Sequence, residues 1–294
     1  MSAPAFAYLP VDSYEAAVAA LCEHGEDARI LAGGQSLMPM LNLRLVRPSV
    51  LVDINAMDGV SPTVLPDGRL SLPAMTRHRI VLESPLVGAG WPLLAAAAGL
   101  VGNVRVRNRG TVGGSLAHGD PTAEVSCATM ALGAEVVVLG SQGSRTIPVR
   151  ELFVTYLTTA LHPDEVVTEV LVPPIGPREG WGFQEMVRRA SDFATVGVAA
   201  TVSLHDDART VRGAQVALVG VADRPVMAAT EPLAALAGTT ATERDLRAAA
   251  EVMAEQTDPP SDVHATGWYR KRLVAVLVAR ALREASARAA GGGR

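Results

Sequence analysis

Two glycine-centred segments are the clearest candidates for chemistry in this sequence. The first reads Ala32, Gly33, Gly34, Gln35, Ser36, and the second reads Thr111, Val112, Gly113, Gly114, Ser115. Glycine lets the backbone approach an anion closely and reach positive φ, so that successive N–H groups can converge on it, and a serine hydroxyl adds a further donor. A single such turn is weak evidence, but two of them predict two loops that close on one phosphate-bearing ligand.

Two ionisable residues follow the second turn, and each has a structural as well as a functional interpretation. His118 is either a catalytic or flavin-linked histidine or, as its position favours, a turn histidine with a local hydrogen bond. Asp120 precedes a proline and is expected to cap a helix over 122–132. Glu124, expected at the third position of that helix, either completes the cap or accepts a hydrogen bond from a ribose or an adenine.

Three arginines and one phenylalanine leave similar alternatives open. Arg105, Arg107 and Arg109 alternate along a stretch expected to be extended, where they would share one face. That face is either a solvated strand edge or a surface that neutralises a diphosphate or docks a partner. Phe193 lies between two predicted strands and is either a core residue or a ring that stacks on a planar cofactor.

The sequence lacks the motifs that are typical of several other classes of enzyme and nucleotide-binding protein. The sequence contains no G-x-G-x-x-G after a strand, no G-x-x-x-x-G-K-[ST], no G-x-S-x-G and no H-E-x-x-H. Rossmann and P-loop nucleotide binding, hydrolase chemistry of the nucleophile-elbow type and zinc peptidase chemistry are therefore disfavoured. The predicted phosphate ligand must be held in another way.

Composition narrows the class of protein further. A chain of 294 residues with 49% hydrophobic and 19% charged residues allows two or three domains with a sizeable core. The net charge of −4 argues against nucleic acid as the main partner. The Ala-rich stretch 93–101 is too short to span a bilayer, so no integral membrane segment is expected.

The two cysteines also limit the chemistry. Cys22 and Cys127 are far apart in the sequence and form no C-x-x-C or Cys/His cluster, so neither a zinc site nor an iron–sulfur cluster is expected. We interpret them as buried, reduced thiols. Because the N-terminus also lacks the pattern of a signal peptide, a cytoplasmic location is expected, at most peripheral to the inner face of the membrane.

The elements that must position these residues divide the chain in two. In the first half, short strands over 28–32, 50–54 and 135–139 alternate with helices over 13–24, 37–45, 77–84, 91–100 and 122–132. The frequent Pro and Gly residues favour an α/β or α+β domain without the regular βαβ units of a Rossmann sheet. The Pro- and Gly-rich segment 173–177 then marks a boundary.

The second half predicts a separate α+β domain. Three strands are expected over 181–189, 194–204 and 211–220, followed by helices over 230–237, 242–256 and 266–288. The sequence therefore predicts a first domain over 1–177, a second over 178–288 and a flexible tail over 289–294.

Taken together, these motifs resemble the FAD-binding medium subunit of molybdenum hydroxylases of the carbon monoxide dehydrogenase and xanthine dehydrogenase type. That family carries an A-G-G-[HQ]-S-L turn, a later [TS]-[IV]-G-G-[NSD]-L turn and an R-R-x-x-D-[FYW]-A segment, which this chain matches at 188–194. Its C-terminal helix motif is similar to Tyr269–Leu273. The resemblance covers nearly the whole chain.

The resemblance implies an α+β fold. A FAD-binding domain with two subdomains, of the vanillyl-alcohol-oxidase (PCMH) type, is followed by a C-terminal α+β domain with a three-stranded antiparallel sheet and helices. It also implies that both turns cradle the FAD diphosphate through backbone amides. The further residues implied at the cofactor are Arg29, Ile30 and Leu31 in the supporting strand, Glu124 and Val167 near the adenosine or flavin, and Gln184, Asp192 and Phe193 from the second domain. Gln184 and Glu185 stand where the family often has a lysine.

The activity implied is electron transfer on FAD, with no catalytic side chain and no metal ligand on this chain. A large subunit would hold the molybdenum cofactor and a small subunit two [2Fe–2S] clusters, as a dimer of heterotrimers. Electrons would pass from the clusters through FAD to a quinone, oxygen or NAD. Two alternatives remain: a stand-alone flavin oxidase with His118 or Tyr156 as acid or base, and a non-enzymatic nucleotide-binding protein.

Overall fold

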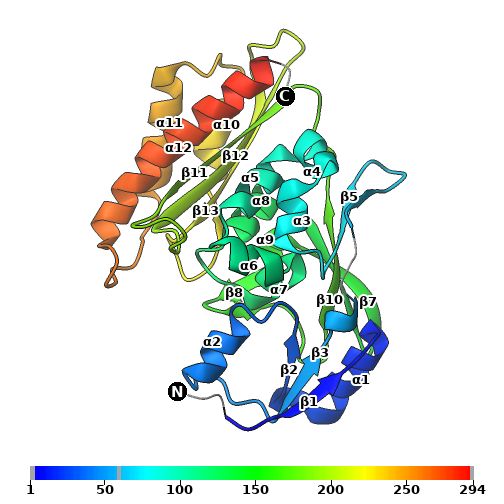
Figure 1. Cartoon of the computed structure of the whole chain (residues 1–294). Coiled ribbons are helices and arrows are strands. Elements are labelled where there is room, and N and C mark those ends of the chain that lie inside the picture. The colour runs from blue at the N-terminus through cyan, green and yellow to red at the C-terminus, as the bar shows by residue number, and fades with distance from the viewer. Residues whose placement is uncertain (1–3, 58–60, 292–294) are drawn as a thin grey trace.

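The computed structural model describes residues 4–57 and 61–291. It contains three layers of structure along the long axis of the molecule, as Figure 1 shows: a small N-terminal sheet, a central region of helices and a five-stranded sheet, and a C-terminal sheet covered by two long helices. The two glycine turns lie where the first layer meets the second.

The N-terminal layer is a parallel sheet with strand order β1–β3–β2. Its strands are Ala7–Pro10 (β1), Ala28–Leu31 (β2) and Val50–Asp53 (β3), and its helices are Tyr14–His24 (α1), Leu37–Asn42 (α2) and the 3-10 turns Gly25–Asp27 (η1) and Asn55–Met57 (η2). Ser13 caps α1 by accepting from the Ala16 N–H, and Gly25 ends it, as the sequence predicts. Buried side chains of α1 pack on the sheet.

The central sheet is antiparallel, with order β4–β5–β10–β6–β7. Its strands are Thr63–Val64 (β4), Leu70–Pro73 (β5), Glu135–Gly140 (β6), Gly143–Pro148 (β7) and Val166–Val172 (β10), and Phe153–Thr155 (β8) pairs with Thr158–Thr159 (β9). One face of this sheet packs against the central helices in a single large core cluster.

The central helices are His78–Glu83 (α3), Pro85–Gly90 (α4), Pro92–Leu100 (α5), Val104–Arg109 (α6), Val112–His118 (α7), Glu124–Ala131 (α8) and Val149–Leu152 (α9). Two of them correct the sequence analysis. The stretch expected to be extended at Arg105–Arg109 is helix α6, because the Asn103 side chain accepts from the Arg105 and Val106 N–H groups and caps it. Helix α8 begins at Glu124, two residues later than expected.

The C-terminal layer is an antiparallel sheet of four strands, not three: Glu179–Met186 (β11), Val196–Leu204 (β12), Val211–Val219 (β13) and Val226–Met227 (β14). The two-residue β14 was missed because it is too short to give a periodic pattern. The sheet is covered by Thr230–Ala234 (α10), Glu243–Glu255 (α11) and Gly267–Ala290 (α12). Because α12 runs to Ala290, it enters the tail expected over 289–294, of which 292–294 lie outside the described residues.

Glycines let α12 lie directly on the sheet. A Cβ at Gly180 would be 2.0 Å from the Ala285 carbonyl oxygen, and one at Gly182 would be 2.2 Å from that of Ala281. Even-numbered residues of β11 therefore face α12. Odd-numbered residues face the central layer, where Phe183 joins the core cluster of the first domain.

The two halves of the chain are thus packed against each other. The core cluster of the central helices also contains Phe183, Ala199, Ala217 and Val219 from the C-terminal sheet. The segment expected as a linker is held in place, since the Trp91 indole N–H donates to the Pro173 carbonyl at 2.7 Å. We call the packing surface between α8 and the face formed by strands β11, β12 and β13 the domain seam.

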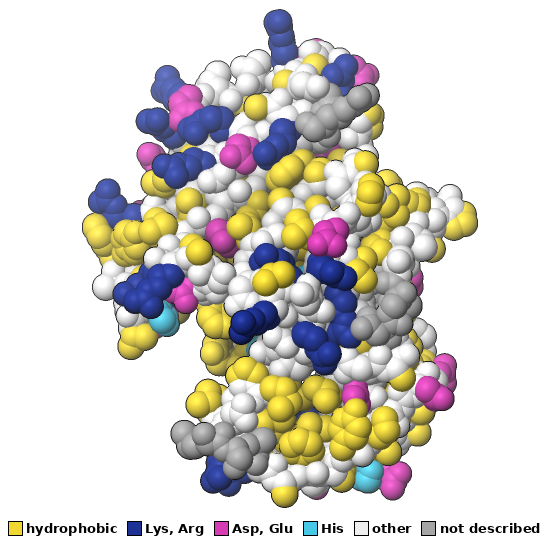
Figure 2. Space-filling model, viewed as in Figure 1, with side chains coloured by type: hydrophobic (Ala, Val, Ile, Leu, Met, Phe, Trp, Pro, Cys, Tyr) yellow, Lys and Arg dark blue, Asp and Glu magenta, His cyan; other side chains and the backbone are white. Residues whose placement is uncertain are grey.

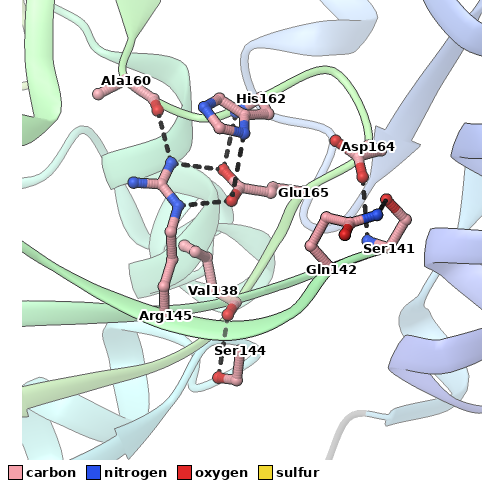
Figure 3. A network of polar contacts seen from close by, with 9 residues as sticks. All are labelled: Val138, Ser141, Gln142, Ser144, Arg145, Ala160, His162, Asp164 and Glu165. Atoms are coloured by element: carbon pink, nitrogen blue, oxygen red, sulfur yellow. Dashed lines mark hydrogen bonds and ion pairs between the residues drawn. The ribbon is translucent and has the colours of Figure 1, made fainter.

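A polar network fixes the β6–β7 hairpin to the start of β10 (Figure 3). The Arg145 guanidinium makes a two-pronged ion pair with Glu165 at 2.6 and 2.7 Å and also donates to the Ala160 carbonyl at 2.9 Å. Glu165 accepts from the His162 N–H, and Asp164 accepts from the Ser141 N–H. The hairpin is therefore anchored by charged contacts in addition to the core packing of Val136, Val138 and Ile147.

Two further observations concern membrane association and thiols. No helix within the described ranges is long and apolar enough to cross a membrane. Cys127 is buried, as expected, but Cys22 is exposed on α1, which corrects the expectation that both thiols are buried. Its neighbour Leu21 occupies the buried face of the helix instead.

Candidate functional site

The two glycine turns are in direct contact, and glycine makes the contact possible. A Cβ at Gly33 would lie 2.3 Å from the Arg109 carbonyl oxygen and 2.8 Å from the Gly110 Cα, so the first turn packs on the backbone that leads into the second. A Cβ at Gly113 would lie 2.5 Å from the Ala74 Cβ. Both glycines are thus required by backbone packing, which sets the relative position of the two turns.

Two polar side chains clamp the turns together. The Asn55 amide donates to the Ala32 carbonyl at 2.8 Å, just before the first Gly-Gly pair. The buried Arg77 guanidinium donates to the Asn55 side-chain oxygen at 2.9 Å and also to the Arg109 carbonyl. The sequence analysis missed this pair. The position of Asn55 just after a buried strand was a signal in the sequence that its side chain could contact a neighbouring loop. No local sequence pattern indicates the role of Arg77.

The first turn presents donors that the chain itself does not use. Among the described residues, the backbone N–H groups of Gly33–Ser36 have no acceptor, and the Ser36 hydroxyl has no partner. Gly34 reaches this conformation with a φ of 71°, which few other residues tolerate. Successive free amides on one turn form the kind of concave nest that binds a phosphate oxygen.

The second turn uses its amides within the fold. The N–H groups of Val112, Gly113, Gly114 and Ser115 donate, in that order, to the Thr76 carbonyl, the Ala74 carbonyl, the Thr111 hydroxyl and the Thr111 carbonyl. This corrects the expectation that both turns offer free amides. The reason is that residues 112–115 form the first turn of α7 against the end of β5. The Ser115 hydroxyl, without a partner in the described chain, is the donor that this turn offers.

Arginines make this region electropositive. Arg107 donates to the Val101 and Gly102 carbonyls, so it holds the start of α6, while Arg105 and Arg109 are exposed. Figure 2 shows Lys and Arg side chains gathered in the middle of the viewed face. The segments 34–52 and 84–119 contain no Asp or Glu, so no acidic residue of these segments offsets that charge. An anionic ligand would be favoured here.

The two histidines near the turns are both disfavoured as cations. His78 is buried against Gly110, and burial together with the Arg107 and Arg77 charges lowers its pKa to about 4. Burial also lowers the pKa of His118, although Asp120 acts against that shift. His118 lies in the last turn of α7, which Gly119 ends in the left-handed conformation. Both interpretations of His118 stay predictions.

Asp120 and Glu124 do not form the helix cap that the sequence predicts, whereas the predicted role of Glu124 at the cofactor stays a prediction. Asp120 accepts from the Thr122 N–H at 2.8 Å and from the Thr122 hydroxyl at 2.6 Å, so it forms a turn and does not cap α8. Ala123 is the residue before the helix, and Glu124 is its first residue. Glu124 is only 8% exposed. Burial, reinforced by the Glu185 and Asp120 charges, raises its pKa to about 7.

Comparison with known proteins agrees with this arrangement. Residues 4–175 match the family model for the FAD binding domain in molybdopterin dehydrogenase, and residues 181–285 match the CO dehydrogenase flavoprotein C-terminal domain. The chain is 37% identical over 289 residues to the alpha subunit of the 6-hydroxypseudooxynicotine dehydrogenase complex of Paenarthrobacter nicotinovorans, covering 98% of this chain and 97% of that subunit.

Solved structures give the same answer. Carbon monoxide dehydrogenase from Hydrogenophaga pseudoflava contains a chain that superposes with a TM-score of 0.93 at 36% identity, over 98% of this chain and 99% of that one. Quinoline 2-oxidoreductase from Pseudomonas putida 86 gives a TM-score of 0.91 at 33% identity over 100% of both chains. The chain is a medium subunit of the molybdenum hydroxylase family. The predicted family, fold class, FAD cofactor and oxidoreductase class are therefore confirmed.

Within this medium subunit, β11 separates two neighbouring residues that the sequence analysis took together. Gln184 points towards α12, where its amide donates to Glu284 at 2.8 Å. That contact places Gln184 on the face away from the central layer and argues against its predicted role at the cofactor. Glu185 lies on the opposite face, towards the domain seam, and its Oε2 is buried without a hydrogen-bond partner.

The other predicted cofactor residues are spread over several elements. Phe193 is 76% exposed in the turn between β11 and β12, so it is not a core residue. Asp192 precedes it in that turn, where its N–H donates to the Arg189 carbonyl. The Val167 side chain is buried in the core on β10. On the edge strand β2, the Arg29 guanidinium donates to the Glu26 and Ala28 carbonyls, on the side away from the glycine turn.

Proposed function

We propose that this medium subunit carries electrons on FAD between a [2Fe–2S] subunit and an external acceptor, in a complex whose large subunit holds the molybdenum cofactor. The first glycine turn is the observation that carries the proposal. Its free amides, the Ser36 and Ser115 hydroxyls and the nearby Arg109 supply donors and positive charge for the FAD diphosphate. When bound, FAD would accept electrons singly or in pairs and pass them on.

The chain's own contribution is to hold and orient the cofactor. Asn55 and Arg77 fix the first turn against the second, so the donors are preorganised before the ligand arrives. Among the described residues there is no group of three or more His, Cys, Asp or Glu side chains that could hold a metal. Exposed Phe193 and neighbouring Asp192 remain proposed contacts of the flavin from the second domain.

Partner contact is supported by an apolar surface beside the site. On and after α2, Leu43 is 61% and Leu45 is 69% exposed, and only Leu41 of this helix is buried. We call residues 37–47 the α2 segment. The segment also contains the exposed Arg44 and Arg47, so a partner with an apolar patch and an acidic rim would fit. We propose that partner subunits bind here and that the complex is a dimer of heterotrimers. The free thiols of Cys22 and Cys127 suit assembly in the cytoplasm.

The flavin content of purified variants tests the cofactor assignment. We expect Gly33→Ala to lose FAD, because the added Cβ would meet the Arg109 carbonyl and displace the first turn. Gly88→Ala is the matched control, since its Cβ would meet nothing within 4 Å. Absorbance in the flavin bands after FAD is added and excess removed gives the occupancy. Full flavin occupancy in Gly33→Ala would show that the cradle is elsewhere.

Two variants that leave the backbone packing unchanged complete the test. Ser36→Ala and Ser115→Ala each remove one hydroxyl donor, and we expect each to weaken FAD binding about tenfold, which corresponds to one lost hydrogen bond to a charged group.

Co-purification separates the alternatives: a stand-alone oxidase needs no partner, whereas a medium subunit comes with a large and a small chain. A chain that binds no FAD at all would be a nucleotide-binding protein of another kind.

A further inference from the structure

The domain seam contains two acidic residues from different domains. Glu124 begins α8 in the first domain and is 8% exposed. Glu185 belongs to β11 in the second domain, and its Oε2 is buried without a hydrogen-bond partner. Neither has an ion-pair partner in the described parts of the chain. Figure 1 shows α8 beside the C-terminal sheet.

Strand register and the packing of α8 on the sheet place Glu124 opposite the row that contains Glu185. The Cys127 thiol donates to the Ala217 carbonyl at 3.3 Å, and Ala217 stands in one cross-strand row with Ala199 and Phe183. The next row on the same face is Val219, Gly197 and Glu185. Glu124 is one helical turn before Cys127 and therefore faces this second row.

A backbone contact confirms the direction in which α8 runs along the sheet. The Gly220 N–H donates to the Pro121 carbonyl at 2.8 Å, so the segment before α8 meets the residue just after Val219. Gly197, the middle member of the row, carries no side chain, and the Val219 side chain fills the space where its Cβ would be, at 2.6 Å. Glu185 is thus the polar member of the row that Glu124 faces.

The surroundings offer no positive charge to balance two carboxylates. The preceding turn contributes Asp120, α8 contributes the buried Cys127 thiol, and α5, β12 and β13 face the seam with apolar side chains and Gly197. Gln184 and Glu284 lie on the other face of β11, and Arg270 is occupied by Asp262 and two carbonyls. Two like charges without a cation in a poorly solvated site cannot both be ionised cheaply.

We propose that Glu124 and Glu185 together form a proton-binding site in the domain seam, and that one shared proton is needed to keep the two domains closely packed. Burial, with the Glu185 and Asp120 charges adding to it, raises the pKa of Glu124 to about 7, and burial does the same for Glu185. The pair titrates as a unit near neutral pH. Loss of the proton leaves two negative charges that push α8 and β11 apart.

The sign of the effect on stability follows from these pKa values. Both groups have folded-state pKa values above their ordinary value of 4.5, so the folded state holds protons that the unfolded state releases. The unfolding free energy therefore falls as the pH rises from about 4.5 to about 7. Above pH 7 both carboxyls are ionised and the whole of this loss in stability remains. A neutral glutamine at either position removes that penalty.

Thermal unfolding of the full chain at pH 5 and pH 8 tests the proposal. We expect Glu185→Gln to raise Tm by about 3 °C at pH 8 and to leave it nearly unchanged at pH 5. Glu15→Gln, which removes an exposed carboxylate from the first turn of α1, is the matched control and should give no such gain. Infrared difference spectra should show the band of a protonated carboxyl at pH 6 that Glu185→Gln and Glu124→Gln each abolish.

A charge-reversal cycle tests whether the two residues are neighbours. Glu185→Lys should raise Tm at pH 8 by forming an ion pair with Glu124, and this gain should vanish in the Glu124→Gln background. Equal Tm shifts at pH 5 and pH 8, or purely additive effects of the two glutamines, would overturn the proposal. So would Mg²⁺ or Ca²⁺ raising the Tm of the unmodified chain at pH 8 to that of Glu185→Gln, since the pair would then be a cation site. None of these readouts needs FAD, so they stand apart from the test of the proposed function.

Discussion

At the scale of residues, the site depends on a few contacts that hold the first glycine turn open. Gly33 is required because the Arg109 carbonyl occupies the space of its side chain, not because the ligand does. The Asn55 side-chain amide donates a hydrogen bond to the Ala32 carbonyl. Because that carbonyl is already paired, it does not compete for the free amides next to it. The turn therefore remains a set of donors without acceptors until an anion supplies them.

Removing the Asn55 amide tests this clamp. Asn55→Ala leaves the Ala32 carbonyl and the Arg77 guanidinium without this partner, so we expect a loss of about 1–3 kcal/mol in unfolding free energy and weaker FAD binding. Urea unfolding and flavin titration measure the two effects. Asn42→Ala, an exposed change at the end of α2, should alter neither. A stable Asn55→Ala chain with unchanged FAD affinity would remove Asn55 from the site.

At the scale of elements, caps and charged anchors decide where segments begin and how they are held. Asn103 makes a helix of a stretch whose alternating arginines suggest an extended strand. The Arg145–Glu165 ion pair holds the β6–β7 hairpin against the segment before β10 (Figure 3). The Glu165 side chain is 6% exposed and that of Arg145 is 41% exposed, so this pair is shielded on one side.

Acid titration tests the hairpin anchor. The hydrogen bond from Arg145 is the main reason that the pKa of Glu165 is lowered, with burial acting against it. Its stabilising contribution is therefore present above pH 4.5 and is lost as the pH falls through the lowered value. We expect Glu165→Gln to reduce unfolding free energy by about 2 kcal/mol at pH 7 and by less at pH 3. Glu151→Gln, which changes an exposed side chain of α9 beside Arg150, should change stability little.

At the scale of the whole molecule, the structure is two packed domains with an unpartnered segment. The domain seam draws buried core residues from both halves of the chain, so we expect the two halves to unfold together. The α2 segment, by contrast, exposes apolar side chains beside an arginine-rich surface. An exposed apolar patch of this kind is typical of a contact surface.

Charged substitutions on the α2 segment test partner binding. We expect Leu43→Asp and Leu45→Asp to reduce co-purification of the large and small subunits at least tenfold while FAD content stays unchanged, because the two side chains lie beyond the turn. Val263→Asp, at another exposed apolar position that is 89% exposed, should leave the complex intact. Loss of FAD with the complex preserved would instead place these leucines at the cofactor.

The sequence by itself determined the family, the cofactor and most elements of the second domain. Those features depend on local signals: glycine pairs that permit a tight turn, helix caps such as Ser13, and alternating apolar residues along long strands such as β12. The predicted domain limits at 177 and 288 and the predicted cofactor residues remain proposals, with Gln184 argued against by its bond to Glu284.

Only the tertiary structure decided which donors are free and which neighbours face each other. The amides of both turns look alike in the sequence. Those of Val112–Ser115 donate to Ala74, Thr76 and Thr111, whereas those of Gly33–Ser36 have no acceptor in the described chain. Glu124 and Glu185 are 61 positions apart, and the packing of α8 on the C-terminal sheet brings them to the same part of the seam. Such long-range pairings depend on how separate elements pack, and no local pattern encodes them.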